Sequence, residues 1–521
     1  MFKKTIYVLI LTAALSFAGQ VFAAELKIGL ASEPSSMDPH YFILSPNVAA
    51  AAHVFERLAT FDTDLQVVPQ LATSWKTVAD TTWEFNLRPN VTFHDGSPFT
   101  AEDVKFTIER VPNVKDARGY DRLVKMIDEV IIIDPLTIRF KTKKPAPLLP
   151  NNLANIFIIS KKHGQGATSA DFNSGKAMIG TGPYKFVEWK PKEHIIYKRN
   201  ENYWGKKEAW DKLTFKPISS STSRVSALLA GDVDVIDAVP PIDVKSLKNN
   251  KKFNVFEKTS YRLIYCTLDQ NRDESPFVVD LKTGQILKNN PLKDIRVRKA
   301  ISKAINRKAI AAKTMKGLAI PAGQLVPNGF FAVSPNLEVE SYDPEGAKQL
   351  LKEAGWADGF GLTIHGPNNR YVNDSKILQA IGQMLTRIGI KTQVVAQPKN
   401  IFFPKSAKLK YSFTMLGWGN MGEPTPIMAH ILHTFNKEKG YGRANRSRYS
   451  NKKFDELMET AMITVDREKQ EKLLIEATDT VIGELGIIPL HFQVNVWATR
   501  KGLSYLGSSV EETYAMSVSA N

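Results

Sequence analysis

Cysteine is nearly absent from the sequence, because Cys266 is the one thiol among 521 residues. This excludes intrachain disulfides and any cysteine-cluster metal or iron–sulfur site, so packing must stabilise the chain. Cys266 also lies far from the N-terminus, so no thiol is available there for the lipid attachment that holds many exported proteins to a membrane. It lies between Tyr265 and Thr267 in an apolar stretch, which predicts a buried core position.

The sequence also lacks the short motifs of common catalytic sites. It contains no Gly-x-Ser-x-Gly nucleophile elbow, no Gly-x-x-x-x-Gly-Lys-Ser/Thr phosphate loop and no His-Glu-x-x-His metal helix. His430 and His433 could share one helix face and hold a transition metal, but no carboxylate or thiol stands beside them in the sequence. A packed or solvent-facing histidine pair is favoured, and we predict no catalytic residue, no metal site and no cofactor.

Long apolar runs are also scarce, and the one that stands out covers residues 6–18. It follows Lys3 and Lys4 and leads through small residues to Ala23, which is typical of a secretory signal. The run breaks at residues 19–20 and is shorter than the roughly 20 residues that a membrane-spanning helix needs, so an uncleaved anchor is the weaker alternative. We predict that residues 1–23 are a signal peptide and that the mature chain is periplasmic.

The charge balance is basic, with 69 lysine and arginine residues against 53 aspartate and glutamate residues, for a formal net charge of +16. An excess of this size invites a nucleic-acid partner. Export argues against that partner, so the sequence predicts no nucleic acid. The positive charge instead favours an anionic envelope surface or an acidic ligand.

The order of predicted elements indicates an α/β protein with two similar units. Residues 25–31 alternate like a half-buried strand, and a loop and a helix at 47–58 follow. In the second half, a strand at 361–365 leads through the polar loop 366–371 to a helix at about 374–388. Loops at strand ends in two α/β lobes form the kind of crevice in which open sheets bind ligands.

Eight segments together resemble one known family, the peptide/nickel family (family 5) of extracellular solute-binding proteins of ABC importers, which includes dipeptide- and oligopeptide-binding proteins. They occur in the family's order and span most of the predicted mature chain. The segments are 32–39 (SEPSSMDP), 71–75 (LATSW), 83–96 (WEFNLRPNVTFHDG), 99–104 (FTAEDV), 180–184 (GTGPY), 228–234 (LLAGDVD), 294–307 (DIRVRKAISKAINR) and 417–418 (GW).

The resemblance implies a periplasmic binding protein-like class II fold with two lobes and a hinge of two crossing segments. Lobe I would hold residues 24–265 and 490–521, with an extra subdomain inserted at about 58–188, and lobe II would hold 266–489. A monomer is expected that closes around a ligand and delivers it to a membrane permease. Most motif residues are explained by turns and helix caps without any ligand.

The resemblance also implies a ligand anchor on lobe II. Arg370 matches by position the arginine that holds a peptide's terminal carboxylate in dipeptide binders, and its planar guanidinium suits that role because it makes two charge-assisted hydrogen bonds. A surface or intraprotein ion pair is the alternative role for such a residue. Tyr371 follows in the same loop and is a second candidate.

A second loop, 416–424, supplies further candidates. Gly417 and Trp418 match the family, and Trp418 is either a stacking wall for an apolar part of the ligand or ordinary core. Family peptide binders usually carry an aspartate here that pairs with the ligand's ammonium group, but this sequence has Asn420. Either Glu423 replaces that charge, or the ligand has no free amino group at this place.

The third candidate region is the loop 35–41, which the family fold places at the cleft on lobe I. Its residues Ser36, Met37 and His40 are expected to clamp an extended ligand through small groups and backbone donors. The resulting hypothesis is a receptor for a short peptide or peptide-like carboxylate, and not an enzyme. The alternatives are a receptor for an opine-like conjugate, a murein peptide, a metal chelate or haem, and, from another class, an exported hydrolase that uses buried carboxylates.

Overall fold

A long mixed sheet joins the two halves of the molecule in the computed structural model, which describes residues 24–115, 119–419 and 422–521. The predicted signal peptide and Asn420 lie outside these residues. The strands run in the order β13 (Val278–Val279), β15 (Phe360–Pro367), β17 (Phe413–Gly419), β12 (Phe253–Leu268), β18 (Ile488–Arg500), β11 (Val235–Ile236), β1 (Glu25–Leu30), β10 (Lys212–Pro217), β9 (His194–Arg199) and β8 (Tyr184–Lys190). Beside this path, β14 (Ala319–Pro321) pairs with β18, and β16 (Ile390–Gln397) pairs with β15.

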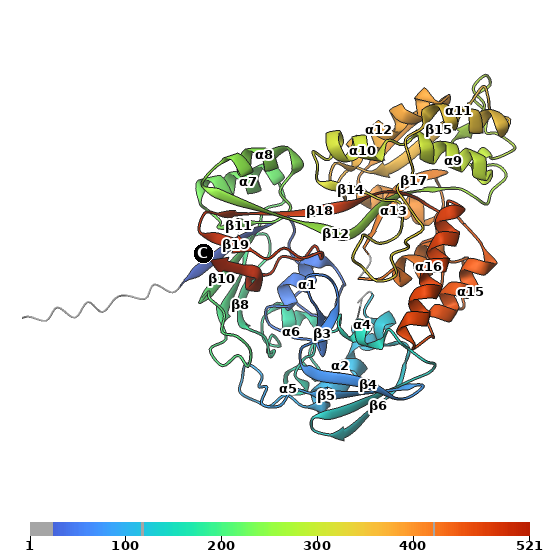
Figure 1. Cartoon of the computed structure of the whole chain (residues 1–521). Helices are drawn as coiled ribbons and strands as arrows, with labels where there is room; N and C mark the ends of the chain where they lie inside the picture. The colour runs from blue at the N-terminus through green and yellow to red at the C-terminus, as the bar shows by residue number, and fades with distance from the viewer. Residues whose placement is uncertain (1–23, 116–118, 420–421) are drawn as a thin grey trace, which may run out of the picture.

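The two longest strands, β12 and β18, cross from one half to the other as an antiparallel pair (Figure 1). The first part of β12 pairs with β18 near β11, and its last part pairs with both β18 and β17. The register between β12 and β18 shifts between Thr259 and Leu263, close to the middle of the crossing. These crossing strands separate a lobe I sheet around β1 from a lobe II sheet around β15, as the class II fold predicts.

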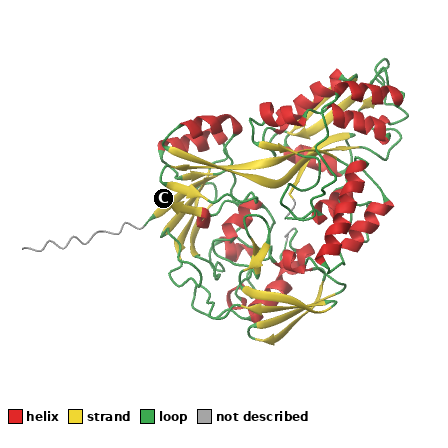
Figure 2. Cartoon of the chain, in the orientation of Figure 1, coloured by secondary structure: helices red, strands yellow, loops and turns green. Residues whose placement is uncertain are grey.

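Lobe I carries a separate four-stranded antiparallel sheet, which Figure 2 shows packed below the helices of this lobe. Its strands are β4 (Ala72–Ala79), β5 (Thr82–Leu87), β7 (Thr137–Thr142) and β6 (Ile127–Asp134), and it has an apolar core of its own. The remaining elements of lobe I are α1 (Ser45–Ala51), β2 (Ala59–Phe61), β3 (Val67–Pro69), α2 (Ala101–Arg110), η1 (Val111–Asn113), α3 (Asp121–Val124), α4 (Leu149–Leu153), α5 (Lys161–Gly164), α6 (Ser169–Asn173), α7 (Ser221–Ala230), α8 (Pro241–Asn249), β19 (Leu503–Tyr505), η5 (Ala515–Ser517) and β20 (Val518–Ala520).

Lobe II packs helices against both its sheet and a second apolar core. Its helices are η2 (Pro291–Lys293), α9 (Ile295–Ala304), α10 (Arg307–Ala309), η3 (Ile310–Thr314), α11 (Pro344–Glu353), α12 (Asp374–Arg387), α13 (Lys399–Ala407), α14 (Thr425–Ile427), η4 (Met428–Leu432), α15 (Lys452–Ala461) and α16 (Arg467–Gly483). No helix in the described ranges is both long and apolar enough to cross a bilayer. Cys266 is fully buried in the lobe II core, as its apolar neighbours predict.

Local sequence signals explain several helix ends, and one helix shows where they fail. The Asp343 side chain accepts a hydrogen bond from the Gly346 N–H and caps α11, in which Pro344 is the first residue. The helix expected at 47–58 instead ends at Ala51. Beyond it, the carbonyls of His53 and Val54 accept hydrogen bonds from the 182–184 segment, so tertiary pairing replaces the helical pattern.

Candidate functional site

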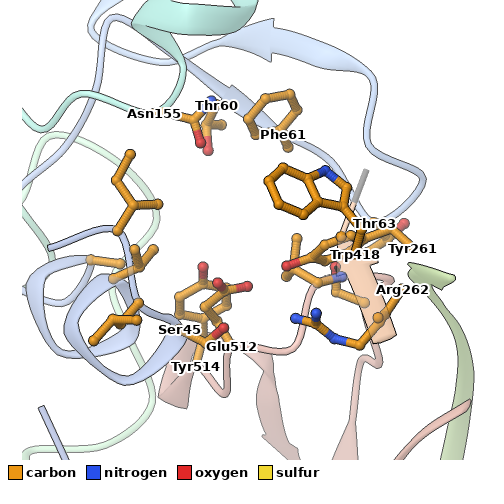
Figure 3. Close-up of a pocket in the computed structure, with 18 of the residues that line it drawn as sticks. Ser45, Thr60, Phe61, Thr63, Asn155, Tyr261, Arg262, Trp418, Glu512 and Tyr514 are labelled. Carbon is orange, nitrogen blue, oxygen red and sulfur yellow. Dashed lines mark hydrogen bonds between the residues drawn. The ribbon is translucent and has the colours of Figure 1, made fainter. Parts of the chain in front are cut away.

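A cavity of about 780 Å³ lies between the lobes, beside the crossing strands. Lobe I and the C-terminal segment line one side, and the β15–α12 loop, β17 and residue 446 line the other. Figure 3 shows part of this lining, with Ser45, Trp418 and Glu512 among the labelled residues. Among the described lining residues, arginines outnumber carboxylates, so the cavity favours an anion. The arginines are Arg57, Arg122, Arg262, Arg370 and Arg446, and the carboxylates are Asp62 and Glu512.

Arg370 reaches the cavity from the loop between β15 and α12. The Asp374 carboxylate shapes this loop, since one of its oxygens accepts hydrogen bonds from the backbone N–H groups of Arg370 (2.9 Å) and Tyr371 (3.1 Å). The Arg370 guanidinium lies 5.1 Å from the centre of the Tyr371 ring, and no described carboxylate lies within 4.0 Å of it. The side chain is exposed to the cavity, so its charge is available to a ligand.

Two glycines of β17 allow aromatic rings to lie against the strand. A Cβ atom on Gly417 would stand 2.8 Å from the Tyr371 ring, and one on Gly419 would stand 2.1 Å from the Tyr261 ring. The Tyr371 hydroxyl donates a hydrogen bond to the Gly417 carbonyl (3.1 Å), which joins the loop to the strand. Glycine is therefore required at both positions for close approach of the rings.

Trp418, between these glycines, is half-buried and lines the cavity. Its indole N–H is shielded from solvent and has no hydrogen-bond partner among the described residues. Buried indole N–H groups usually find a partner. The side chain therefore presents an apolar face to the cavity, while its shielded N–H is left without a partner among the described residues.

Arg262 and Glu511 form an ion pair at the cavity wall. Arg262 lies on β12, and its guanidinium donates two hydrogen bonds to the Glu511 carboxylate, the longer being 2.7 Å. Burial raises the pKa of Glu511, but the charge and hydrogen bonds of Arg262 outweigh it and hold that pKa below its usual range. The charge of Arg262 is therefore paired within the protein, whereas the charge of Arg370 has no described carboxylate partner.

Glu512 follows directly and is in the opposite situation. Its side chain is 7 % exposed, it lines the cavity, and its Oε2 atom has no hydrogen-bond partner. Burial raises the pKa of this carboxyl to about 7, and the neighbouring Glu511 charge adds to the rise. Ser45 and Tyr514 lie beside Glu512 in the same part of the cavity (Figure 3).

The structure places the candidates of the 35–41 loop away from the cavity lining. Ser36, Met37 and His40 are each at most 3 % exposed. The Ser36 hydroxyl donates to the Asn173 side-chain oxygen (2.9 Å), and His40 Nε2 lies 2.7 Å from the Phe157 carbonyl oxygen. The expectation that this loop clamps the ligand does not match the geometry, and the lining begins at the next segment, residues 43–45.

Glu423 also lies outside the lining and is buried. Its carboxylate accepts a hydrogen bond from the Thr425 N–H (2.9 Å) at the start of α14, so it is engaged in a local turn. The other candidate in this loop, Asn420, is not among the described residues. The structure therefore does not bring Glu423 to the place where a ligand's ammonium group was expected.

His430 and His433 pack against neighbouring side chains, which the sequence favours over a metal site. His433 Nε2 lies 3.0 Å from a Glu459 oxygen, and Lys439 donates hydrogen bonds to the same carboxylate. The His430 ring lies 5.9 Å from the Trp418 ring, and burial lowers its pKa to about 4. Within the described ranges, no group of three or more histidine, cysteine, aspartate or glutamate side chains is placed to hold a metal ion.

Comparison with known proteins identifies the family. Residues 66–439 match the model of the bacterial extracellular solute-binding proteins, family 5, middle region. The chain belongs to this family.

Relatives and solved structures of family 5 extend the match over nearly the whole chain. A glutathione-binding protein, GsiB, from Pectobacterium atrosepticum is 28% identical over 95% of this chain and 93% of its own length. The dipeptide-binding protein of Escherichia coli is 27% identical over 89% of this chain and 88% of its own length. The solved structure of CtaP, an ABC transporter substrate-binding protein from Listeria monocytogenes, shares the fold with a TM-score of 0.82 and 23% identity, over 96% of this chain and 99% of that one.

Several residues in or beside the cavity of this family 5 protein were not predicted from the sequence. Arg262 is the one charged residue in the second half of β12, residues 261–268, and Glu511 and Glu512 stand together near the C-terminus. An isolated charge in an apolar run signals a buried, paired or functional group, and that signal could have marked Arg262. The sequence contains no signal that residues 506–517 return to the cavity.

Proposed function

We propose that this chain is a periplasmic receptor that binds a short peptide or peptide-like carboxylate in the inter-lobe cavity and delivers it to the permease of an ABC importer. The observation that carries the proposal is the unpaired guanidinium of Arg370 in a cavity whose described charges are mostly arginines. A cavity of about 780 Å³ suits a solute of the size of a short peptide. The names of the relatives, which bind glutathione and dipeptides, favour the same ligand class.

Affinity in this proposal comes from desolvating the ligand between the lobes. Arg370 makes charge-assisted hydrogen bonds to the ligand's carboxylate, and Trp418 offers an apolar wall. Ordered water fills the space that different side chains leave, which tolerates ligand variety. The ligand is bound intact, because the proposal assigns no reacting group.

We place the hinge in the crossing strands and keep the lobe boundaries expected from the sequence, 24–265 with 490–521 for lobe I and 266–489 for lobe II. The register shift between Thr259 and Leu263 supports this place, because a broken ladder bends more easily than a regular one. Closure about such a hinge is a common response of two-lobed proteins to a ligand. The permease would then recognise the closed form.

The test replaces Arg370 with alanine, with Arg387→Ala as the matched control on the exposed end of α12. Alanyl-alanine and reduced glutathione are the probes, and calorimetric titration is the measurement. Loss of a desolvated carboxylate partner costs about 2–5 kcal/mol, so we expect Kd to rise at least about thirtyfold in Arg370→Ala and to stay unchanged in the control.

Unchanged affinity in Arg370→Ala would show that the anchor is assigned wrongly. If the wild-type protein binds neither probe and native mass spectrometry finds a different co-purified solute, the ligand is not a peptide. Cleavage products of the probes in the same samples would favour an exported hydrolase instead.

A further inference from the structure

Glu512 is a buried carboxyl to which the proposed function assigns no role. It is more than nine-tenths buried, it faces the cavity, and none of the described basic groups lies within 4.0 Å of it. Its Oε2 atom is shielded from solvent and accepts no hydrogen bond. A buried acceptor without a donor costs free energy, and a buried charge without a partner costs more.

The neighbouring residue shows that this is not a general property of the segment. Glu511 is paired with Arg262 through two hydrogen bonds, so the protein supplies a full partner one residue away. Glu512 receives no such partner, and it lines the cavity in which a solute would lie (Figure 3). Unsatisfied buried groups of this kind cluster where a ligand completes the bonding.

Other unsatisfied groups line the same cavity. Besides Glu512 Oε2, the described side chains with a shielded, unpartnered polar atom include Arg57, through Nε, and Trp418, through Nε1. These two are donors, so they suit a carboxylate or carbonyl oxygen of a solute. Glu512 is an acceptor, and it suits the opposite kind of group.

We propose that Glu512 is the second anchor of the cavity and that it binds a primary ammonium group of the ligand, while Arg370 of the other lobe binds the carboxylate. This inference rests on the proposed function and narrows its substrate class to solutes that carry both a free amino group and a carboxylate. An ammonium group supplies the opposite charge that Glu512 lacks and a donor for its Oε2 atom. A ligand held at both ends also bridges the lobes and favours closure.

The surroundings of Glu512 set the pH dependence of this anchor. Glu511 stays ionised because Arg262 holds its pKa low, and burial raises the pKa values of the surrounding tyrosines, so they stay neutral. Glu512 itself has a pKa raised to about 7, first by burial, then by Glu511, with Arg57 and Ser45 opposing the rise. Glu512 therefore loses its charge as the pH falls below about 7, and binding of an ammonium group should weaken. The tyrosines concerned are Tyr120, Tyr261 and Tyr514.

The test compares two probes, alanyl-alanine and N-acetyl-alanyl-alanine, on the wild-type protein, on Glu512→Gln and on the exposed control Glu193→Gln. We expect the wild type and the control to bind the free amine about tenfold to a hundredfold tighter than the acetylated form. Glu512→Gln should bind both forms with similar affinity. Between pH 8 and pH 6, affinity for the free amine should fall in the wild type more steeply than in Glu512→Gln.

The outcomes separate this inference from the proposed function. If the wild type does not discriminate between the probes, or if Glu512→Gln still discriminates, the inference is wrong while the receptor function stands. If the wild type binds neither probe, the proposed peptide ligand fails and the inference fails with it. Glu512→Asp keeps the charge on a shorter side chain, so it should retain part of the preference for alanyl-alanine over the acetylated probe. It serves as the working variant if Glu512→Gln does not fold.

Discussion

Two loops at strand ends, 35–41 on lobe I and 366–371 on lobe II, were expected to face the ligand, but only the second lines the cavity. In the first loop, Asp38 is fully buried and pairs with Arg110 of α2 through two hydrogen bonds of 3.1 and 2.7 Å. In the second, Arg370 has no described carboxylate within 4.0 Å. The same local pattern of strand, loop and helix therefore has a structural role in one lobe and an open charged group in the other.

The difference comes from what packs on each loop. Arg110, Phe157 and Asn173, from the stretch that runs from α2 to α6, satisfy polar groups of the 35–41 loop. The 366–371 loop instead donates hydrogen bonds within its own lobe, to the Asp374 carboxylate and to the Gly417 carbonyl. An open polar group in a cavity, and not the position of a loop at a strand end, marks the ligand site.

The largest expected effect, on stability, comes from removing the charge of Asp38, which forms the buried ion pair of the first loop. Asp38→Asn breaks a buried ion pair and leaves the Arg110 charge uncompensated, so we expect the free energy of unfolding to fall by about 3–5 kcal/mol. Equilibrium urea denaturation measures it. Affinity of the folded protein for a peptide probe should stay unchanged, because the loop is not in the cavity.

Glu345→Gln is the control, since Glu345 forms an exposed pair with Lys348 that adds little stability. A large loss of ligand affinity in folded Asp38→Asn would contradict the contrast between the two loops. It would show that the 35–41 loop contributes to binding.

The strand and the helix that flank the second loop were predictable from the sequence. The long-range contacts that decide whether a loop is buried or open were not. The strand expected at 361–365 and the helix at about 374–388 correspond to β15 and α12, because a short buried run defines the strand and apolar periodicity defines the helix. The partner of Asp38 is 72 residues away in the chain, and the Arg262–Glu511 pair spans 249 residues. No periodic pattern encodes such pairings, so the sequence could not distinguish a sealed loop from an open one.

A smaller effect is expected at the strand that faces the second loop. In Gly419→Ala, the added methyl group would overlap the Tyr261 ring, which is 6 % exposed and cannot move freely. Overpacking of this kind costs about 1–3 kcal/mol of stability, and displacement of the ring into the cavity should weaken binding of a peptide probe. Thermal denaturation and calorimetric titration measure the two effects.

Gly483→Ala is the matched control, because no atom lies within 4 Å of a Cβ added at that helical position. It should keep or slightly raise stability. Equal stability and equal affinity of the two variants would mean that the close approach of Tyr261 to β17 does not shape the cavity.

The smallest effect tests whether the second loop binds through its charge or through its shape. Tyr371→Phe removes the hydrogen bond to the Gly417 carbonyl but keeps the ring beside Arg370, so we expect a stability loss of about 0.5–1.5 kcal/mol. Tyr342→Phe, at a 40 % exposed tyrosine, is the control. If Arg370 is the anchor, affinity for a peptide probe should change far less in Tyr371→Phe than in Arg370→Ala. Comparable losses would mean that the rigid geometry of the loop, held by the hydroxyl, matters as much as the guanidinium, and the two loops would then differ in degree and not in kind.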